Sequence, residues 1–284
     1  MPSVVFMGRK PGAVVAFEHL LAREWDVKYV ITPADEADWL PRPSLGDVAD
    51  AAGIEVMEWR PFLGMVKDGE LSAVHGGGVD WVFSYLFPHL ITRPVLNLPE
   101  NGVLNFHPAP LPGYGGLGGY NFAILEGQHE YGVTCHFVDE HFDTGDIVEV
   151  RRFAMDPDRV TALSLEHISQ KHLIDLFRDI VAQIENAGEL PRTSQCNATR
   201  YINRAEFEGQ KKVPPGETGD DLERRVRAFW YPPYDGALIE LGGNQYTLAA
   251  SNLLQAIGPS VHADDLIYLR SHVDRNGRAD HQQR

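Results

Sequence analysis

The chain has 284 residues, of which 43% are hydrophobic and 23% charged, and its formal net charge is −15. This length allows one large domain with a small one beside it, while the acidic balance argues against a nucleic-acid partner, which needs clustered Lys and Arg. No apolar run approaches the roughly 20 residues that span a bilayer, and the first residues read as a strand and not as a signal peptide. We therefore expect a cytoplasmic protein with no membrane partner.

Short apolar runs alternate with helical patterns over the first 190 residues. Strands are expected at residues 4–7, 27–31, 54–57, 79–84, 104–106, 132–138 and 147–153. Helices are expected at residues 12–21, 44–52, 121–125 and 161–185. Alternation of this kind is typical of parallel β-α-β units, in which ligands bind at the carboxyl ends of the strands. The pattern predicts an α/β fold with a mainly parallel sheet.

The second part of the chain predicts a different organisation. Residues 191–204 resemble a polar linker, and residues 205–250 predict a small β-rich domain, with one helix at 220–229 and a hairpin at 237–249. Residues 251–284 form a tail whose polar end is expected to be disordered. Two cysteines, Cys135 and Cys196, are too few for a disulfide framework and lack the neighbours of a zinc site, so no metal is expected.

Three polar residues stand out near the expected strand ends. Asn105 lies in the expected strand at 104–106, His107 follows that strand directly, and Asp143 follows the next strand along the chain. An amide that binds an oxyanion, an imidazole that accepts a proton and a carboxylate that orients the imidazole would together form an acyl-transfer site. We interpret these three residues as a catalytic set.

The motifs around them resemble those of the N10-formyltetrahydrofolate-dependent formyltransferases. They read Asn-Phe-His-Pro-Ala-Pro-Leu-Pro at 105–112, Gly-Leu-Gly-Gly-Tyr-Asn-Phe-Ala-Ile at 116–124 and His-Phe-Val-Asp-Glu-His-Phe-Asp-Thr-Gly-Asp-Ile at 136–147. Within that family the chain is most similar to the nucleotide-sugar N-formyltransferases, and the segment at 227–237 resembles the start of their C-terminal domain. The resemblance implies a Rossmann-like catalytic domain over residues 1–190.

The resemblance also implies a reaction. A formyl group would pass from N10-formyltetrahydrofolate to the amine of a nucleotide-linked amino-deoxy sugar, commonly a dTDP-4-amino-4,6-dideoxyhexose, through a tetrahedral intermediate. Asn105, His107 and Asp143 match the family's catalytic residues, and the product would serve glycan biosynthesis. Relatives often pair through the C-terminal domain, so a homodimer is also implied.

Binding residues follow from the same resemblance. The folate donor is expected at the strand-end loop and the segment 138–143, which assigns cofactor contacts to Ser84, Tyr85, Leu86 and Asp139. The nucleotide sugar is expected at two cations after the first strand and at four residues of the later motifs: Arg9, Lys10, Tyr120, Asn121, Tyr231 and Tyr234.

Simpler explanations compete for several of these residues. Arg9 and Lys10 after a strand are typical of solvated cations, the Tyr-Pro-Pro-Tyr segment at 231–234 is also typical of a rigid packing corner, and His136 is expected to be an ordinary strand residue. One departure concerns the loop at 112–116, which reads Pro-Gly-Tyr-Gly-Gly and lacks the basic residue that related enzymes often carry there.

Other functions remain open. Methionyl-tRNA formyltransferase shares the catalytic residues but needs a basic tRNA surface, whereas residues 206–250 hold five Lys and Arg against eight acids, a net charge of 5 − 8 = −3. Glycinamide ribonucleotide transformylase does not explain the segment after about residue 205, and no regulatory domain like that of formyltetrahydrofolate hydrolase fits before residue 4. A non-catalytic protein that binds folate or a nucleotide sugar is the alternative from a different class.

Overall fold

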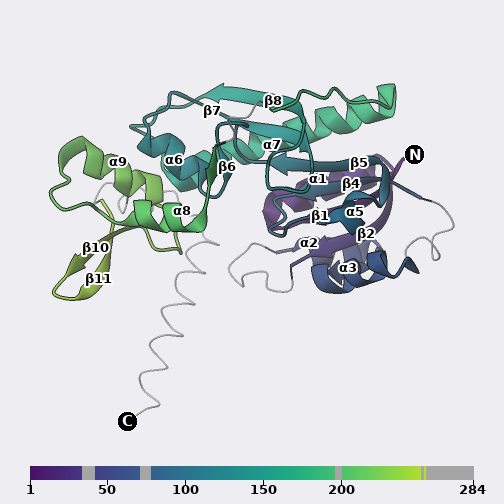
Figure 1. The fold of residues 1–284 in the computed structure, drawn as a ribbon, viewed down its shortest axis with the longest axis horizontal. Helices are drawn as coiled ribbons and strands as arrows, with labels where there is room; N and C mark the ends of the chain where they lie inside the picture. The colour runs from purple at the N-terminus through teal and green to yellow at the C-terminus, as the bar shows by residue number, and fades with distance from the viewer. Residues whose placement is uncertain (34–41, 71–77, 196–199, 251–252, 254–284) are drawn as a thin grey trace, which may run out of the picture.

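The computed structural model describes residues 1–33, 42–70, 78–195, 200–250 and 253. Its centre is a seven-stranded sheet with the order β3-β2-β1-β4-β5-β7-β8. The first five strands of this order run parallel, and β7 and β8 are antiparallel additions at one edge. The predicted α/β class with a mainly parallel, Rossmann-like sheet is confirmed (Figure 1).

The strands of this sheet are β1 Ser3–Gly8, β2 Asp26–Thr32, β3 Val56–Glu58, β4 Val79–Tyr85, β5 Pro99–His107, β7 Glu130–Phe137 and β8 Ile147–Ala154. The helices that accompany it are α1 Lys10–Ala22, α2 Leu45–Ala51, α3 Trp59–Lys67, α5 Arg93–Leu96, α6 Gly119–Leu125 and α7 Ala162–Ala187.

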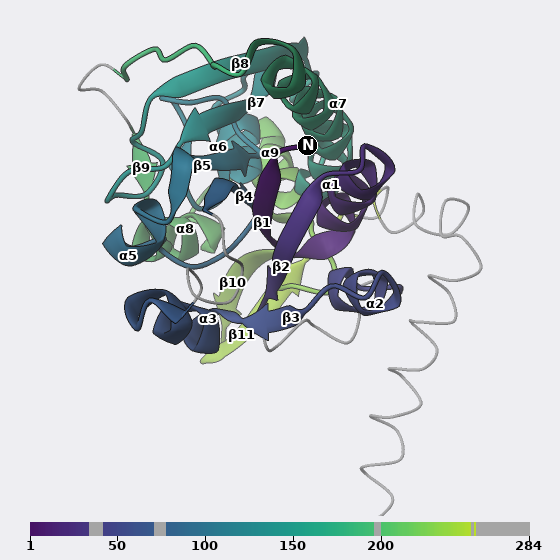
Figure 2. The same cartoon turned by 90° about the vertical axis from the view of Figure 1, so that its right-hand side faces the viewer.

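Helices lie on both faces of the sheet, as Figure 2 shows, and an apolar cluster fills the space on each face. Helices α1, α2 and α7 pack on one face through a core that includes Phe17, Leu45 and Phe177. Helices α3 and α5 cover part of the opposite face, with Phe62 and Val95 buried there. Because side chains alternate along a strand, β5 sends Leu104 and Phe106 into the first layer and leaves Val103, Asn105 and His107 on the second face.

The longest helix, α7, begins and ends with standard capping signals. Thr161 accepts a hydrogen bond from the Ser164 amide, the Ser164 hydroxyl accepts one from the Thr161 amide, and Gly188 ends the helix in the left-handed conformation. The helix buries one face against the sheet and also carries Glu166, a buried carboxylate that faces the later part of the chain.

The later part of the chain contains α8 Arg204–Lys211, α9 Gly219–Phe229 and a hairpin of β10 Ala237–Leu241 and β11 Asn244–Leu248. The predicted small β region is confirmed, together with the predicted helix α9, while α8 was not anticipated. Figure 1 shows these elements grouped at one end of the molecule beside α6. There Ala228 and Phe229 share a small core with Ala123 and Ile124.

Candidate active site

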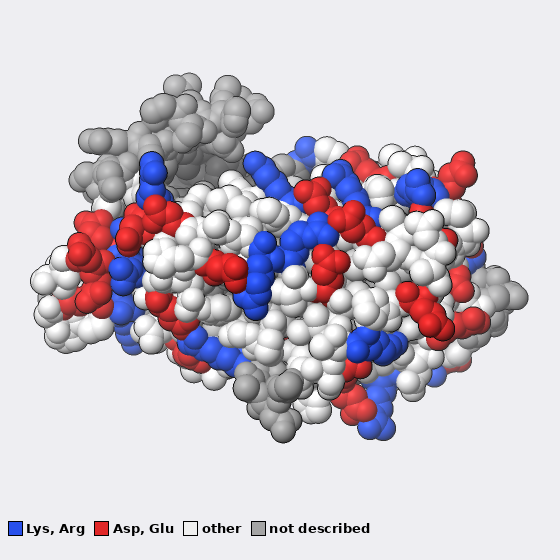
Figure 3. Space-filling model, turned by 90° about the horizontal axis from the view of Figure 1, so that it is seen from above, with Lys and Arg blue, Asp and Glu red and all other residues white. Residues whose placement is uncertain are grey.

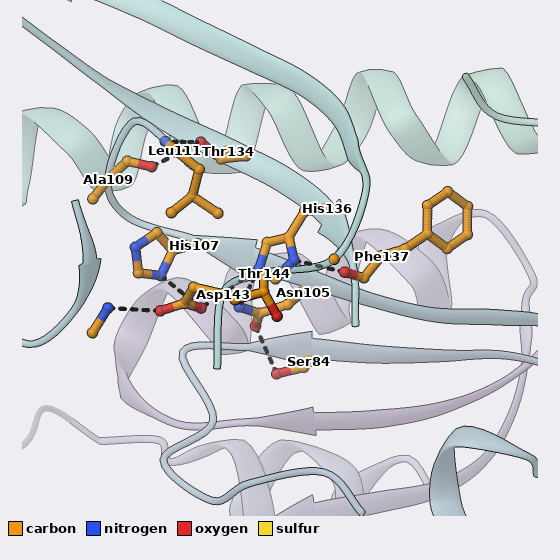
Figure 4. Close-up of polar contacts among 12 residues, drawn as sticks. Ser84, Asn105, His107, Ala109, Leu111, Thr134, His136, Phe137, Asp143 and Thr144 are labelled. Atoms are coloured by element: carbon orange, nitrogen blue, oxygen red, sulfur yellow. Dashed lines mark hydrogen bonds and ion pairs between the residues drawn. The ribbon is translucent and has the colours of Figure 1, made fainter. Parts of the chain in front are cut away.

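Three polar side chains form a row across neighbouring strands on the face of the sheet opposite α7. The register pairs Ser84 of β4 with Asn105 of β5, and Asn105 with His136 of β7. The Ser84 hydroxyl donates to Oδ1 of Asn105 over 2.8 Å, and Nδ2 of Asn105 donates to Nε2 of His136 over 3.0 Å (Figure 4). The row holds the Asn105 amide in one orientation.

His136 ends this row with a defined proton position. Its Nδ1 lies 2.7 Å from the carbonyl of Phe137, to which it donates, so Nε2 is the nitrogen left to accept from Asn105. The ring is 1% exposed. The strand residue that the sequence treated as ordinary is therefore part of the polar network.

His107 lies two residues after Asn105 and faces the same side. Its Nε2 lies 2.9 Å from the carbonyl oxygen of Tyr114, which can only accept, so this nitrogen carries a proton. Its Nδ1 lies 3.5 Å from Oδ1 of Asp143. That separation is longer than a standard hydrogen bond, so Nδ1 is directed at the carboxylate without being fully engaged by it.

Asp143 joins the two imidazoles. Its Oδ1 also lies 3.6 Å from Nε2 of His136, and its Oδ2 accepts from the backbone amide of Gly116 over 2.8 Å. Burial alone would raise the pKa of Asp143, but the neighbouring His107 and His136 and the Gly116 amide hold this pKa well below its usual range. The carboxylate therefore stays ionised beside the two rings.

The loop from β7 to β8 sets the position of Asp143. Asp143 itself adopts a left-handed backbone conformation with φ of 58°. Oδ1 of Asp139 accepts from the Thr144 hydroxyl over 2.6 Å and from the His141 amide over 3.0 Å. A Cβ on Gly145 would overlap the carbonyl oxygen of Phe137, which explains the glycine of the Asp-Thr-Gly-Asp motif.

The loop after His107 is held by β7. The Thr134 hydroxyl donates to the carbonyl of Ala109 over 2.8 Å and accepts from the amide of Leu111 over 3.0 Å. This loop leads to the Tyr114 carbonyl and the Gly116 amide, which contact His107 and Asp143. The Pro-rich motif thus returns the backbone to the side chains of His107 and Asp143. No arginine stands in this loop, but Arg200 lies 6.0 Å above the Tyr114 ring and pairs with Glu126 and Glu206.

The residues predicted to bind the folate cofactor lie in or near this network of hydrogen bonds. Ser84 orients Asn105, and Asp139 shapes the loop of Asp143. Tyr85 is fully buried, and its hydroxyl donates to Gln170 over 3.3 Å. Leu86 follows β4 with φ of 55°, a conformation rare for a branched side chain.

The residues predicted for the nucleotide sugar divide into two groups. Lys10 is engaged: its Nζ lies 2.6 Å from Oε1 of Glu166 and 5.6 Å from the centroid of the Tyr231 ring, and Tyr231 donates to Glu166 as well. Burial and the charge of Glu166 raise the pKa of Tyr231. Among the described residues, the Arg9 guanidinium makes no ion pair. Tyr234 is half exposed and packs against Tyr231.

Helix α6 carries the remaining two. Nδ2 of Asn121 donates to the carbonyl of Ala228 over 2.6 Å, a buried contact between α6 and α9. The Tyr120 hydroxyl is buried, and no protein hydrogen-bond partner is found for it in the described part of the chain. Asn121 is thus occupied by a structural contact.

Sequence reasoning missed three groups that act through the backbone or through register: His136, the Tyr114 carbonyl and Gln195, whose amide holds the loop of Asp143. The motif that contains His136 was the only available signal.

Within the described ranges no group of three or more His, Cys, Asp or Glu could hold a metal ion, and none of the helices there is long and apolar enough to cross a membrane. Cys135 is buried and free, and Cys196 lies outside the described residues.

Part of the chain matches a known protein family. Residues 65–172 match the family model described as Formyl transferase. GDP-perosamine N-formyltransferase of Brucella melitensis biotype 1 is 26% identical over 178 residues, which cover 63% of this chain and 67% of that protein. Methionyl-tRNA formyltransferase of Syntrophomonas wolfei subsp. wolfei is 25% identical over 280 residues, which cover 96% of this chain and 85% of that protein.

A solved structure extends the comparison to three dimensions. The N-formyltransferase from Helicobacter canadensis, in complex with folinic acid and dTDP-3-aminofucose, superposes with a TM-score of 0.69 over 86% of this chain and 85% of that chain. Its sequence identity of 22% makes this a likeness of fold.

Proposed function

We propose that this chain is a formyltransferase, which transfers a formyl group from N10-formyltetrahydrofolate to the amine of a nucleotide-linked amino-deoxy sugar. The match of residues 65–172 to the Formyl transferase model supports the reaction class. The observation that carries the proposal is the convergence of Asn105, His107 and Asp143 at the end of β5. The complex of the Helicobacter canadensis enzyme with folinic acid and dTDP-3-aminofucose supports the two substrate classes.

Asn105 fits the role of oxyanion donor. One of its two amide hydrogens goes to His136, and the other has no acceptor among the described residues. A fixed N–H directed at the formyl oxygen stabilises the negative charge of a tetrahedral intermediate, and one such donor is typically worth about 10²–10³ in turnover.

His107 fits the role of base. Since Nε2 carries a proton for the Tyr114 carbonyl, the lone pair of the neutral ring is on Nδ1, next to Asp143. As the sugar amine forms its bond to the formyl carbon, its proton passes to Nδ1, and the carboxylate stabilises the resulting imidazolium. When the bond from that carbon to N10 breaks, the same proton neutralises the departing nitrogen. Atoms and charges balance without a metal or a covalent enzyme intermediate.

The finer proposal is a dTDP-4-amino-4,6-dideoxyhexose as acceptor. It is supported by the motif resemblance and by a dTDP-linked amino sugar in a fold relative, while the Brucella relative is named for a GDP sugar. For the diphosphate we propose Arg9, whose guanidinium makes no ion pair within the described ranges, and for the nucleotide ring we propose Tyr234, which is half exposed.

The domain boundaries, the cytoplasmic location and the homodimer also stand as proposals. The catalytic domain covers residues 1–190, the linker 191–204 and the C-terminal domain 205–250. Exposed Leu241 and Tyr246 on the hairpin of β10 and β11 support pairing of two copies there.

Methionyl-tRNA formyltransferase is the rival that one observation favours, because the Syntrophomonas relative matches nearly the whole chain. Charge opposes it. On the face shown in Figure 3, Lys and Arg side chains lie among Asp and Glu side chains. Arg151 pairs with Glu149 and Asp179, and Arg152 pairs with Glu130. Because tRNA binding needs clustered Lys and Arg to neutralise phosphates, a face on which cations and acids are mixed does not resemble a tRNA site.

One assay tests the proposal against its alternatives. Purified protein is given N10-formyltetrahydrofolate with a panel of GDP- and dTDP-linked 3- and 4-amino sugars and, separately, with methionyl-initiator tRNA. We expect release of tetrahydrofolate and an N-formyl sugar with at least one sugar. Turnover with the tRNA alone would establish the rival, and binding of a nucleotide sugar without turnover would establish a non-catalytic binding protein.

A further inference from the structure

Residues 192–195, which follow the long helix α7, contact the loop between β7 and β8 that carries Asp143. Thr193 forms a two-way bridge with Ile147: the Ile147 amide donates to the Thr193 carbonyl over 2.8 Å, and the Thr193 amide donates back over 2.9 Å. Next to it, the Arg192 guanidinium lies 3.4 Å from the centroid of the Phe137 ring. This stretch is therefore anchored at both ends of the loop that carries Asp143.

Gln195 makes the contact that reaches the catalytic loop directly. Its Nε2 lies 2.7 Å from the carbonyl oxygen of Gly145 and 3.1 Å from that of Asp143. Two carbonyl oxygens can only accept, so both contacts identify this atom as the amide nitrogen with its two hydrogens. The other amide atom, Oε1, is buried, and no donor for it is found in the described residues. The side chain thus acts on the loop through its donors alone.

The backbone that Gln195 holds is unusual. Asp143 has φ of 58°, a left-handed conformation that is uncommon outside glycine and that Asp adopts more readily than most residues, and Gly145 lies against the carbonyl of Phe137. A residue in this conformation persists when its surroundings fix it. The two donated hydrogen bonds fix the carbonyls of Asp143 and Gly145, on either side of Thr144 and directly after the left-handed residue. They therefore help to hold the carboxylate of Asp143 between His107 and His136.

A later stretch of the same segment holds the other catalytic loop. The Gly115 amide donates to the Arg200 carbonyl over 2.9 Å, and the Leu117 amide donates to the Ile202 carbonyl over 2.9 Å. Between them lies Gly116, whose amide binds Asp143. A Cβ on Gly116 would overlap the Ile202 carbonyl oxygen, which shows how closely the two backbones approach.

We propose that Gln195 is a positioning residue of the formyl-transfer site, which sets the placement of the Asp143 carboxylate beside His107 from a segment outside the catalytic motifs. The proposal rests on the function proposed above for its kinetic consequence, but its structural part concerns Asp143 alone. Because misplacement of a catalytic group costs rate more than binding, the effect belongs in kcat.

The first test is Gln195→Met, which keeps the length of the side chain and removes both donors. We expect kcat to fall roughly ten- to hundredfold while KM for the formyl donor and for the sugar changes by less than about twofold. Gln183→Met, the same substitution near the C-terminal end of α7, is the matched control and should leave kcat unchanged.

The second readout does not require turnover. In wild-type protein labelled at the aspartate carboxyl carbons, NMR should show Asp143 still ionised when ordinary aspartates titrate near pH of about 4. In the Gln195→Met protein the pKa of Asp143 should move towards its ordinary value, because the carboxylate has left its partners. If the wild-type protein formylates no substrate, the proposed function fails, yet this titration still decides whether Gln195 places Asp143.

A third variant protects the test against misfolding. In Gln195→Glu the ionised carboxylate can only accept hydrogen bonds, so it repels the carbonyl oxygens of Asp143 and Gly145. When protonated, the new side chain has one O–H that can donate to one of them. We therefore expect the ratio of variant to wild-type kcat to rise as the pH is lowered. Wild-type kcat in the Gln195→Met protein, or a loss of kcat with an unchanged Asp143 titration, would overturn the positioning role.

Discussion

The Ser84 hydroxyl donates a 2.8 Å hydrogen bond to the side-chain oxygen of Asn105, and this contact decides which way the Asn105 amide faces. With Oδ1 turned to Ser84, Nδ2 points to His136 and keeps one hydrogen for a ligand. The hydroxyl lies at a register position directly beside Asn105 on the neighbouring strand. The sequence predicted that Ser84 contacts the folate. In the structure its hydroxyl orients Asn105, the residue proposed to bind the oxyanion.

Removal of the Asn105 amide should lower kcat more than removal of its support. We expect Asn105→Ala to reduce kcat about 10²–10³-fold, since one oxyanion donor is lost. Ser84→Ala should cost less, because the amide remains and only its orientation is loosened. Steady-state kinetics of both variants measure the order, and a larger loss in Ser84→Ala would mean that Ser84 contacts a substrate itself.

Replacement of the imidazole should remove the proton acceptor. We expect His107→Asn to lower kcat about 10²–10⁴-fold with a small change in KM, as is typical when a general base is lost. The measurement is initial-rate kinetics with the best sugar of the panel. A variant that kept the wild-type rate would show that another group takes the amine proton.

Acid stability should report the environment of Asp143. Its pKa is depressed in the folded protein despite burial, because of His107, His136 and the Gly116 amide, so the unfolded chain binds more protons at this site than the folded one. Its stabilising contribution is therefore complete above the unfolded pKa of about 4 and is lost as the pH falls towards the folded value. We expect Asp143→Asn to flatten the decline of the unfolding free energy below pH of about 4 in urea titrations. Parallel curves for the variant and the wild type would contradict the depressed pKa.

Asn121 should matter for stability and not for catalysis. Its amide satisfies the buried carbonyl of Ala228 at the contact of α6 with α9. Asn121→Ala leaves that carbonyl without a partner, which should cost about 1–3 kcal/mol of unfolding free energy. The folded variant should keep its wild-type KM for the sugar. A raised KM with unchanged stability would support the substrate contact predicted from the sequence.

The two cations after β1 should behave differently. Arg9→Ala should raise KM for the nucleotide sugar and leave the melting temperature unchanged, because its guanidinium makes no ion pair in the described part of the chain. Lys10→Ala removes one partner of the buried Glu166 and should destabilise the protein by about 3–5 kcal/mol. Kinetics and thermal unfolding of the pair distinguish ligand binding from structural support. The reverse pattern would assign the diphosphate to Lys10.

The sequence was sufficient for the sheet, because apolar runs separated by helical patterns predict parallel β-α-β units, and it placed His107 at a strand end. Helix α3 escaped prediction because Pro61 and Gly64 lower its helix propensity, and burial of Phe62 stabilises it instead. His136 could not be recognised because its role depends on strand register, and Gln195 because its partners are backbone atoms fifty or more residues away. Contacts between residues far apart in the chain leave no recognisable pattern in the sequence around either residue.

The antiparallel register that sets Asn105 opposite His136 also limits how this chain tolerates insertions and deletions. An extra residue in the turn between α6 and β7 leaves the ladder intact. A single residue inserted inside β7 rotates the following side chains to the opposite face, so the imidazole of His136 enters the apolar layer and Cys135 or Phe137 meets the amide. Insertions and deletions should therefore be tolerated in the turn between α6 and β7 and not within β7.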